Sequence, residues 1–594
     1  MADGQQNSDE MVFTLMPQAG ISRDGTLLGD KFCSDGQWVR FQRGDAKKMG
    51  GYREFTEDLA GPVRKLLVWT RGNMNSVVSF SSSKIENLLV DNNFTGNDIL
   101  DRTPSADFTP ATNNLWTVDT QYDDAVGTTG TIILAHCNQS LANIDDGTAT
   151  KPYWALASST STLFAAITDA PAVSGGVFSI APYTIAYGSD GYVAWSDVNQ
   201  PQVWAGSAVP GDAGADRVTG AKIVAGLPLR AGQLAGLLWS LDSVIRMDYV
   251  GGAAIWRFSV VSTQSSILAQ NSVIEYDGAY FWIGVDRFLY FDSGVKELPN
   301  DMNHNWFFDN LNYSHRQKIW ATKVPRFGEI WWFYPRGEAT ECSHAVIFNV
   351  RLKTWYDVEL ARSAGYYSQV RSYPVWVGSD TAGQHRRLVA SGTATGGSTT
   401  HLIDAGQSFV SLGVAIGDTV ELDSGELGLT VSNVTATDLT CTASAATYSG
   451  KAYRITRDIP AGTTYDAYQH EIGYNAVSGD NEIAIPSHFT TPSFGFPTGG
   501  ISDAQQGMSR WTRLTRVEPD FIQTGDMTMS VLGYEFAQSP ADPEATYTFS
   551  PDTGKIDLRE QRRHILLKFS SNVVDGFYEA GRVIIHTEPG DNRS

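Results

Sequence analysis

Residues 276–293, YDGAYFWIGVDRFLYFDS, decide the fold class of this chain. The stretch divides into a strand over 279–285, a turn at Asp286-Arg287 and a second strand over 288–293. Both strands are too short for helices and are rich in aromatic and β-branched residues, which favour extended structure. The stretch therefore predicts a β-hairpin, and its aromatic side chains are expected to fill a core.

Similar but less regular hairpins begin near residues 65, 131, 183, 236, 328 and 374. With the first hairpin they make about seven copies at intervals of roughly 50 residues, a period typical of β-propeller blades. The inner strands of a blade can be apolar on both faces because neighbouring blades cover both. We therefore expect an all-β chain with a β-propeller of six to eight blades over residues 61–390.

The rest of the chain divides by composition. Residues 300–321 have apolar positions only partly at helical spacing, so one short helix between blades is expected there. Over 391–462 glycine, serine and threonine replace the aromatic pattern, which predicts an inserted small β-barrel. Its turn-rich ends predict that deleting about 395–457 leaves the propeller folded. Residues 463–594 alternate apolar and polar positions, which indicates a β-sandwich-like platform domain.

Composition and charge limit the functions that are open to the chain. Its 594 residues are 42% hydrophobic and 11% aromatic, enough to bury several cores. With 65 acidic against 44 basic residues, the net charge of −21 disfavours wrapping by nucleic acid, and DNA should slide past. No secretory signal and no apolar run of membrane-spanning length are apparent. We expect a soluble chain made in a cytoplasm, without stable membrane insertion.

The cysteines and histidines do not form a metal-binding pattern. The four cysteines are far apart in sequence and are expected to be free, buried thiols: Cys33, Cys137, Cys342 and Cys441. Cys342 and His344 lack the second pair that a zinc site needs. His470-Glu471 lacks the second histidine of an HExxH motif.

Motifs for catalysis are missing as well. The sequence contains neither a GxxxxGK[ST] phosphate loop nor a GxSxG nucleophile elbow. The acid pairs Asp123-Asp124 and Asp145-Asp146 stand in turn-like contexts, although a glycosidase could assemble two carboxylates in space. RGD at 43–45 is expected to be a structural turn. We therefore expect no catalytic, cofactor-binding or metal-binding residues, no cofactor and no enzymatic activity.

Five stretches together resemble the tail nozzle (tail tube) proteins of short-tailed bacteriophages: residues 29–55, 237–252, 262–337, 510–527 and 579–591. The resemblance runs in order through most of the chain, is most specific at 262–337 and does not include 391–460. It implies a homo-hexamer that docks beneath the portal and its adaptor ring, contacts tail fibres or spikes, and forms the distal channel for genome ejection. Residues 1–60 would supply N-terminal strands of the docking platform, and the protein would reside in the virion tail after synthesis in the cytoplasm of the host bacterium.

The charge agrees with a passage for double-stranded DNA. A hexamer would carry six times the formal charge of −21, and a lumen of like charge repels duplex DNA, so contact would be transient and non-specific. The alternative is a receptor-binding or glycan-cleaving β-propeller tail protein, because the 16 tryptophans and 24 tyrosines suit stacking on sugars.

Overall fold

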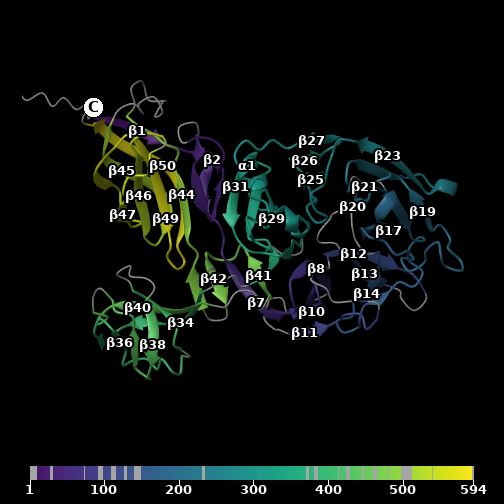
Figure 1. Cartoon of the computed structure of the whole chain (residues 1–594), viewed down its shortest axis with the longest axis horizontal. Helices are drawn as coiled ribbons and strands as arrows, with labels where there is room; N and C mark the ends of the chain where they lie inside the picture. The colour runs from purple at the N-terminus through teal and green to yellow at the C-terminus, as the bar shows by residue number, and fades with distance from the viewer. Residues whose placement is uncertain are drawn as a thin grey trace, which may run out of the picture.

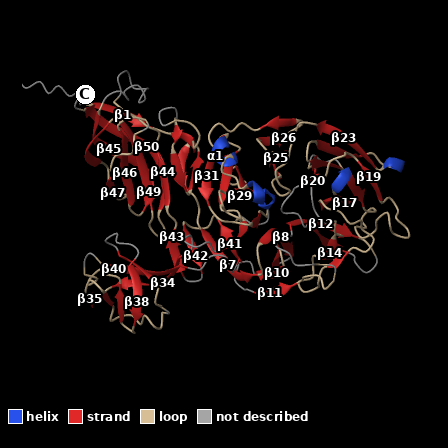
Figure 2. Ribbon diagram, viewed as in Figure 1, coloured by secondary structure: helices blue, strands red, loops and turns tan. Residues whose placement is uncertain are grey.

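The computed structural model describes residues 10–590 except 27–30, 72–73, 91–97, 107, 109–114, 126–129, 139–148, 231–233, 369–372, 380–385, 413, 423–428, 445–446, 459–464, 479–480, 497–510 and 538. Nearly all regular structure in this part is strand (Figures 1 and 2). Figure 1 shows three parts: a ring of small sheets, a small module at the lower left, and a two-sheet platform that carries the C-terminus.

Six four-stranded antiparallel sheets follow one another along the chain and form blades 1 to 6 of a β-propeller. Blades 1 to 3 are β8 (Val63–Arg71), β9 (Met74–Ser81), β10 (Ile85–Val90), β11 (Asp98–Asp101); β12 (Leu115–Asp123), β13 (Gly130–Asn138), β14 (Tyr153–Leu156), β15 (Ala165–Ala166); and β16 (Gly176–Ile180), β17 (Tyr183–Tyr187), β18 (Tyr192–Trp195), β19 (Gly214–Arg217). Blades 4 to 6 are β20 (Ile223–Pro228), β21 (Ala235–Ser240), β22 (Val244–Tyr249), β23 (Trp256–Ser262); β24 (Ile274–Tyr276), β25 (Ala279–Ile283), β26 (Phe288–Phe291), β27 (Val295–Glu297); and β28 (Trp320–Val324), β29 (Glu329–Tyr334), β30 (His344–Asn349), β31 (Thr354–Glu359). The strands of each blade pair in chain order, and the first strands of most neighbouring blades contact one another.

Blade 7 is assembled from distant parts of the chain. Its strands lie in the order β32 (Ala364–Tyr366), β33 (Val375–Ser379), β41 (Tyr465–His470) and β7 (Tyr52–Leu59), and β42 (Asn475–Ser478) and β43 (Asn481–Ala484) extend the sheet outward. Pairing of β7 with β41 joins the beginning of the propeller to its end. The propeller therefore differs from the expected 61–390, because two of its strands come from the segments assigned to the platform.

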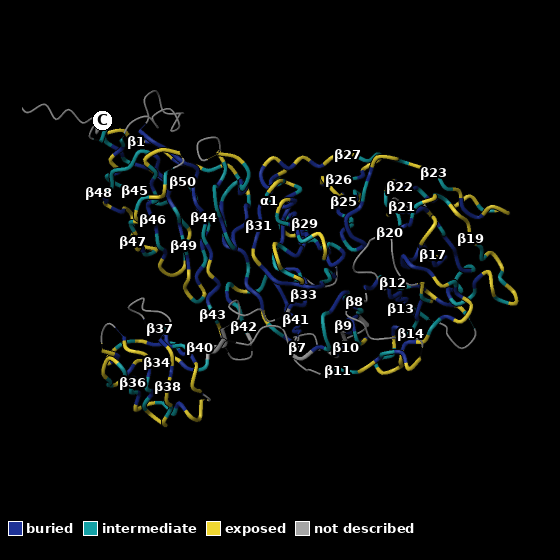
Figure 3. Tube along the Cα trace, in the orientation of Figure 1, coloured by how far each residue is buried: buried dark blue, intermediate teal, exposed yellow. Residues whose placement is uncertain are grey.

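Aromatic residues fill the interfaces between the blades. In the first hairpin, Trp282 packs edge-on against Trp239 of blade 4, whereas Phe288 contacts Trp332 of blade 6. Each of the seven pairs of neighbouring blades shares a hydrophobic cluster, which closes the ring. The blade strands are accordingly mostly dark blue in Figure 3. The predicted propeller and the burial of both faces of this hairpin are confirmed.

Local predictions along the propeller had mixed outcomes. The hairpin over 276–293 is confirmed as β25 and β26, and the short helix as α1 (His304–Phe308), which is followed by a 3-10 turn. The hairpin expected from 374 is wrong, because β33 pairs with β41 and β34 (Arg386–Thr393) pairs with β40 (Ala452–Asp458) instead. Most of the second half of the hairpin expected from 131 lies outside the described residues.

The inserted module is a rolled seven-stranded sheet between β33 and β41. Its order is β34, β40, β37 (Thr419–Leu422), β38 (Leu429–Val434), β39 (Asp438–Cys441), β36 (His401–Ile403) and β35 (Gly396–Gly397). It has its own hydrophobic core, which includes Phe409 and Tyr453. Ser379 and Tyr465 face each other in the β33–β41 ladder, so the module leaves and re-enters blade 7 at one place.

The platform is a sandwich built from both ends of the chain. One sheet has the order β48 (Ile556–Arg562), β45 (Thr512–Thr524), β50 (Phe577–Pro589), β6 (Asp45–Lys48) and β5 (Val39–Gln42), with β1 (Met11–Leu15) also paired to β50. The other has β4 (Asp35–Gln37), β44 (Ser487–Thr490), β49 (His564–Ser571), β46 (Met527–Tyr534) and β47 (Ala545–Phe549). Inward-facing residues such as Val517, Met529 and Phe569 form the shared core. A parallel pair, β2 (Gln18–Ile21) and β3 (Phe32–Cys33), lies beside β31.

Candidate functional site: the propeller axis and the platform junction

The segment 267–272, which connects blades 4 and 5, crosses the centre of the propeller. All of its residues except Asn271 are buried. Gln270 Nε2 donates to the carbonyl of Gly175 at 3.3 Å, just before the first strand of blade 3. Asn271 Nδ2 donates to the carbonyl of Trp116 in blade 2 at 3.5 Å. Both bonds reach blades that are not neighbours of blade 5.

Asn271 also contacts blade 1 and blade 6, the next blade along the chain. Lys65 Nζ of blade 1 donates to Asn271 Oδ1 at 3.1 Å, and the backbone N–H of Ala321 in blade 6 donates to the Asn271 carbonyl at 2.8 Å. A segment that bonds to blades 1, 2, 3 and 6 must lie across the axis. The axis of one propeller is therefore closed at this end.

A cluster of charged side chains, the axial cluster, gathers beside this segment. It comprises Lys65, Asp119, Arg230, Glu275 and Lys323, which come from five different blades. Lys323 Nζ donates to Glu275 Oε2 at 2.9 Å, and Arg230 Nε lies 3.7 Å from the same oxygen.

Asp119 is held by backbone donors. Its Oδ2 accepts from the N–H of Ser179 in blade 3, and its Oδ1 accepts from the N–H of Thr120, both at 2.8 Å. The carboxylate therefore ties the innermost strands of blades 2 and 3 together.

The two carboxyls of the axial cluster are shifted in opposite directions. Burial raises the pKa of Asp119, and the bonds from Ser179 and Thr120 only partly offset it. Burial also acts on Glu275, but the bonds from Gly278 and Lys323 outweigh it and lower the pKa of that carboxyl. Burial lowers the pKa of Lys65 to about 8. The ion pairs with Lys323 and Arg230 also contribute to the low pKa of Glu275.

The sequence offered no sign of this cluster. Its members are scattered over about half of the chain, and each stands in an ordinary strand or loop context. Only the closing of the propeller brings them together, so no motif spacing could have identified them.

The platform is fastened to the propeller by a buried ion network. Arg40 of β5 places Nε 2.9 Å from Glu329 Oε1 of blade 6, and its Nη1 donates to Glu471 Oε2 at 2.6 Å. Tyr356 Oη and Trp331 Nε1 donate to the two oxygens of Glu329 at 2.6 and 2.9 Å. Glu471 of the incomplete HExxH motif is thus a structural partner of an arginine.

The other residues considered from the sequence are structural. His470 accepts from Arg362 Nε at 3.0 Å, and Cys342 Sγ donates to the Lys318 carbonyl at 3.2 Å. Cys342 and His344 lie within the hairpin region of blade 6. Within the described residues no group of three or more histidine, cysteine or acidic side chains could hold a metal ion.

Asp123 of the first acid pair and the RGD stretch both lie in turns. Asp123 Oδ2 accepts from Gln202 Nε2 at 2.7 Å and its Oδ1 accepts from the N–H of Ala125, which is a turn arrangement. Asp145-Asp146 lies outside the described residues. Arg43 and Gly44 have φ angles of 57° and 101° and form the turn between β5 and β6, which confirms the expected turn at RGD.

Tryptophan is not displayed for stacking on sugars. All 16 tryptophans lie in the described part of the chain, and none of them is exposed. Trp282, Trp331 and Trp332 are fully buried in the blades. The tryptophan content therefore reflects the propeller core.

Comparisons with known proteins identify no family. No family model and no curated protein match the chain. Among solved structures, a putative exported protein from Bacteroides fragilis has 8% identity and a TM-score of 0.25, covering 63% of this chain and 86% of its own. An exo-β-1,3-galactanase from Phanerochaete chrysosporium has 10% identity and a TM-score of 0.26, covering 91% of this chain and 100% of its own. Similarity at this level carries no conclusion about function.

The described residues contain no helix that is both long and apolar enough to cross a membrane.

Proposed function

We propose that this chain is a structural virion protein, the subunit of a homo-hexameric tail nozzle of a short-tailed bacteriophage. It docks beneath the portal and adaptor ring, contacts tail fibres or spikes, and forms the distal channel for genome ejection without enzymatic activity. The observation that carries the proposal is the resemblance of five stretches to tail nozzle proteins, because several of them are joined in the fold. Stretch 510–527 contains β45 and stretch 579–591 contains most of β50, and these two strands pair along their length. Stretch 29–55 contains β6, which also pairs with β50.

The closed axis supports a channel between subunits. Segment 267–272 lies across the propeller, so DNA could not thread a single chain. A conduit then requires copies arranged around a common axis, through a heterologous interface that closes into a ring. Blades with both faces covered suit this role because they resist deformation when neighbours dock.

Electron microscopy of negatively stained chain, alone and with its adaptor ring, tests the proposal. We expect six-fold rings that cap the adaptor and leave a continuous central opening. Monomers that neither form rings nor bind the adaptor would refute the assignment, and a closed end without an opening would refute the conduit.

The axial cluster favours one alternative, a receptor-binding or glycan-cleaving propeller in the tail. Asp119 and Glu275 bring two carboxyls into one cluster, and a pair of carboxyls is the minimum that a glycosidase needs. Purified chain can be incubated with envelope polysaccharide of the host, together with Asp119→Asn and a control Asp277→Asn in an exposed turn. The alternative requires cleavage that Asp119→Asn abolishes and the control retains. Unchanged polysaccharide with wild-type chain would exclude the cleaving form of the alternative.

A further inference from the structure

β23 is a long strand with one free edge. It is the outermost strand of blade 4, and within the described residues its far side pairs with no other strand. It has seven residues, whereas β11, β15, β19 and β27 have four, two, four and three. The six-residue β31 is packed against β2 and β4 of the N-terminal segment. A free edge offers unpaired N–H and C=O groups to another strand.

β23 has little protection against such pairing over residues 256–260. Proteins commonly guard edge strands with charged residues, especially lysine, with proline or with a bulge, and the one charged residue of β23 is Arg257. The sequence of β23, WRFSVVS, contains neither lysine nor proline, and Val260 is 56% exposed. The one irregularity in its pairing with β22 falls between Val260 and Ser262. Residues 256–260 therefore form a regular edge.

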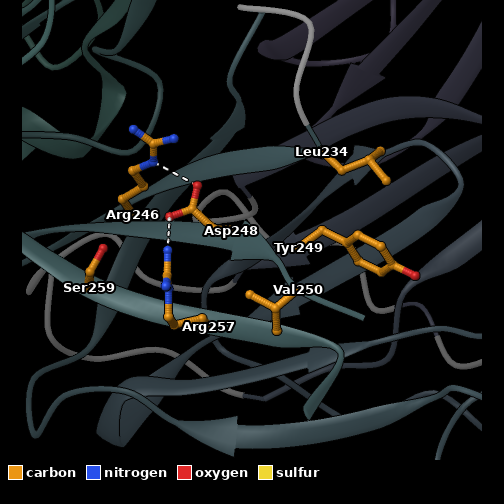
Figure 4. Close-up of a pocket in the computed structure, with 7 residues that line it drawn as sticks. All are labelled: Leu234, Arg246, Asp248, Tyr249, Val250, Arg257 and Ser259. Atoms are coloured by element: carbon orange, nitrogen blue, oxygen red, sulfur yellow. Dashed lines mark hydrogen bonds and ion pairs between the residues drawn. The ribbon is translucent and has the colours of Figure 1, made fainter. Parts of the chain in front are cut away.

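A cleft that contains charged side chains lies over β22 and β23, next to this edge (Figure 4). It has a volume of about 660 Å³ and is lined by Leu234, Arg246, Asp248, Tyr249, Val250, Arg257 and Ser259. In Figure 4, Arg246 and Arg257 approach Asp248 from opposite sides. Arg246 Nε donates to Asp248 Oδ1 at 2.8 Å, but Arg257 Nη2 is 3.9 Å from Asp248 Oδ2.

Arg257 is the cation that is available to a partner. Its side chain is 69% exposed, and its distance to Asp248 is longer than that of a hydrogen bond. Asp248 accepts a hydrogen bond from Arg246, so Arg257 supplies the positive charge that the cleft offers to a ligand, although the chain as a whole carries −21. A carboxylate placed in the cleft could accept two parallel bonds from the guanidinium of Arg257.

The two sides of the edge differ in chemistry. Arg257 and Ser259 point into the cleft, and alternation along a strand turns Phe258 and Val260 to the other side. A strand added to this edge would alternate in the same way. Its complement has acidic residues toward Arg257 and apolar residues toward Val260.

We propose that the free edge of β23 binds, by strand addition, an extended segment of a partner protein in which acidic and apolar residues alternate. Main-chain hydrogen bonds supply the pairing, and the cleft selects the acidic side chain. The inference rests on the edge and the cleft alone and is independent of the proposed function.

The test measures fluorescence anisotropy of labelled seven-residue peptides with full-length chain. The probe alternates glutamate and valine, and two matched peptides replace glutamate with lysine or carry N-methyl groups on alternate amides. We expect saturable binding of the glutamate peptide, no binding of the lysine peptide and loss of binding on N-methylation. Because these peptides are compared on wild-type chain, this part of the test does not depend on the folding of a variant.

Two protein variants locate the site. Arg257→Glu should weaken binding of the glutamate peptide by about 10-fold or more, the effect of losing a charge-assisted hydrogen bond. Arg217→Glu is the matched control, because Arg217 is 63% exposed on the outer strand of blade 3 and is also ion-paired. Its binding should change by less than about 2-fold.

Several results would overturn the proposal. Failure of wild-type chain to bind the glutamate peptide, or equal binding of the N-methylated peptide, would exclude strand addition. Equal effects of the two variants on peptide binding would exclude the cleft as the binding site of the acidic side chain. If Arg257→Glu changes the association state of the chain in a sedimentation experiment, the edge forms an interface between copies of this chain. That result would exclude a separate partner protein.

Discussion

Replacing Arg40 with methionine should lower the free energy that stabilises the junction between the platform and the propeller. Arg40 and Glu329 are 1% and 0% exposed, and Glu471 is 7% exposed. At an effective dielectric constant of about 20, two unit charges 2.9 Å apart attract by roughly 6 kcal/mol, much of which desolvation offsets. Removing only the arginine leaves two carboxylates buried without a cation, and such losses cost about 3–5 kcal/mol.

Hydrogen–deuterium exchange measures this loss of stability at the junction itself. The amides of β5 and β29 lie on the two sides of the network, and their exchange reports local opening. A loss of about 3 kcal/mol corresponds to exchange roughly 100-fold faster in Arg40→Met. Arg43→Met is the control in the same hairpin, because Arg43 is 77% exposed and its ion pair with Glu579 should contribute at most about 1 kcal/mol.

The effect should depend on pH. Burial raises the pKa of Glu329, and loss of Arg40 would raise it further. A carboxyl with a higher pKa in the folded state holds its proton more tightly when folded, so stability falls as pH rises from about 4 through the raised pKa. Arg40→Met should therefore be less destabilised at pH 5 than at pH 8, and adding Glu329→Gln with Glu471→Gln should restore protection. Exchange in Arg40→Met within about 3-fold of that in Arg43→Met would refute this account.

Three further outcomes are expected. All four cysteines are buried and free, and burial raises the pKa of Cys33 to about 12 and that of Cys441 to about 11. The native chain should therefore react with thiol reagents only when it unfolds. A disulfide found by non-reducing mass spectrometry would contradict this. Deleting the inserted module should leave a soluble propeller with unchanged protection from hydrogen exchange in blade 7, since Ser379 and Tyr465 are already paired. Because β34 pairs with β40, the deletion should remove 386–458, which is more than the 395–457 expected from the sequence. An insoluble product would show that the module is part of the propeller core. If the proposed hexamer lines a DNA path, its lumen should be mainly acidic or uncharged, and purified rings should bind duplex DNA weakly even at low salt. Replacing several lumen acids with lysine should slow ejection without blocking assembly. Tight, steeply salt-dependent DNA binding by wild-type rings would contradict this and would place the acidic residues on the outer surface.

The sequence alone determined the local elements. The aromatic hairpin at 276–293, the short helix within 300–321, the inserted module and the alternating strands of the platform were all predictable. Each of these depends on neighbours within a few residues, such as turn residues at Asp286-Arg287 or a local change in composition. The all-β class followed from their sum.

The candidate site was not predictable in this way. Asp119 and Glu275 belong to innermost strands of different blades, and Asn271 meets Lys65 only because the ring closes. No fixed spacing relates these residues, so the sequence could name none of them as a site.

Only the tertiary structure decided how the ends of the chain are used. β7 completes blade 7 by pairing with β41, and Arg40 meets Glu329 and Glu471 across the platform junction. The error at the hairpin expected from 374 has the same origin, since β33 has its partner beyond an entire inserted module. Pairing over hundreds of residues is set by which edges and apolar faces remain uncovered after local folding, and a local sequence pattern does not contain that information.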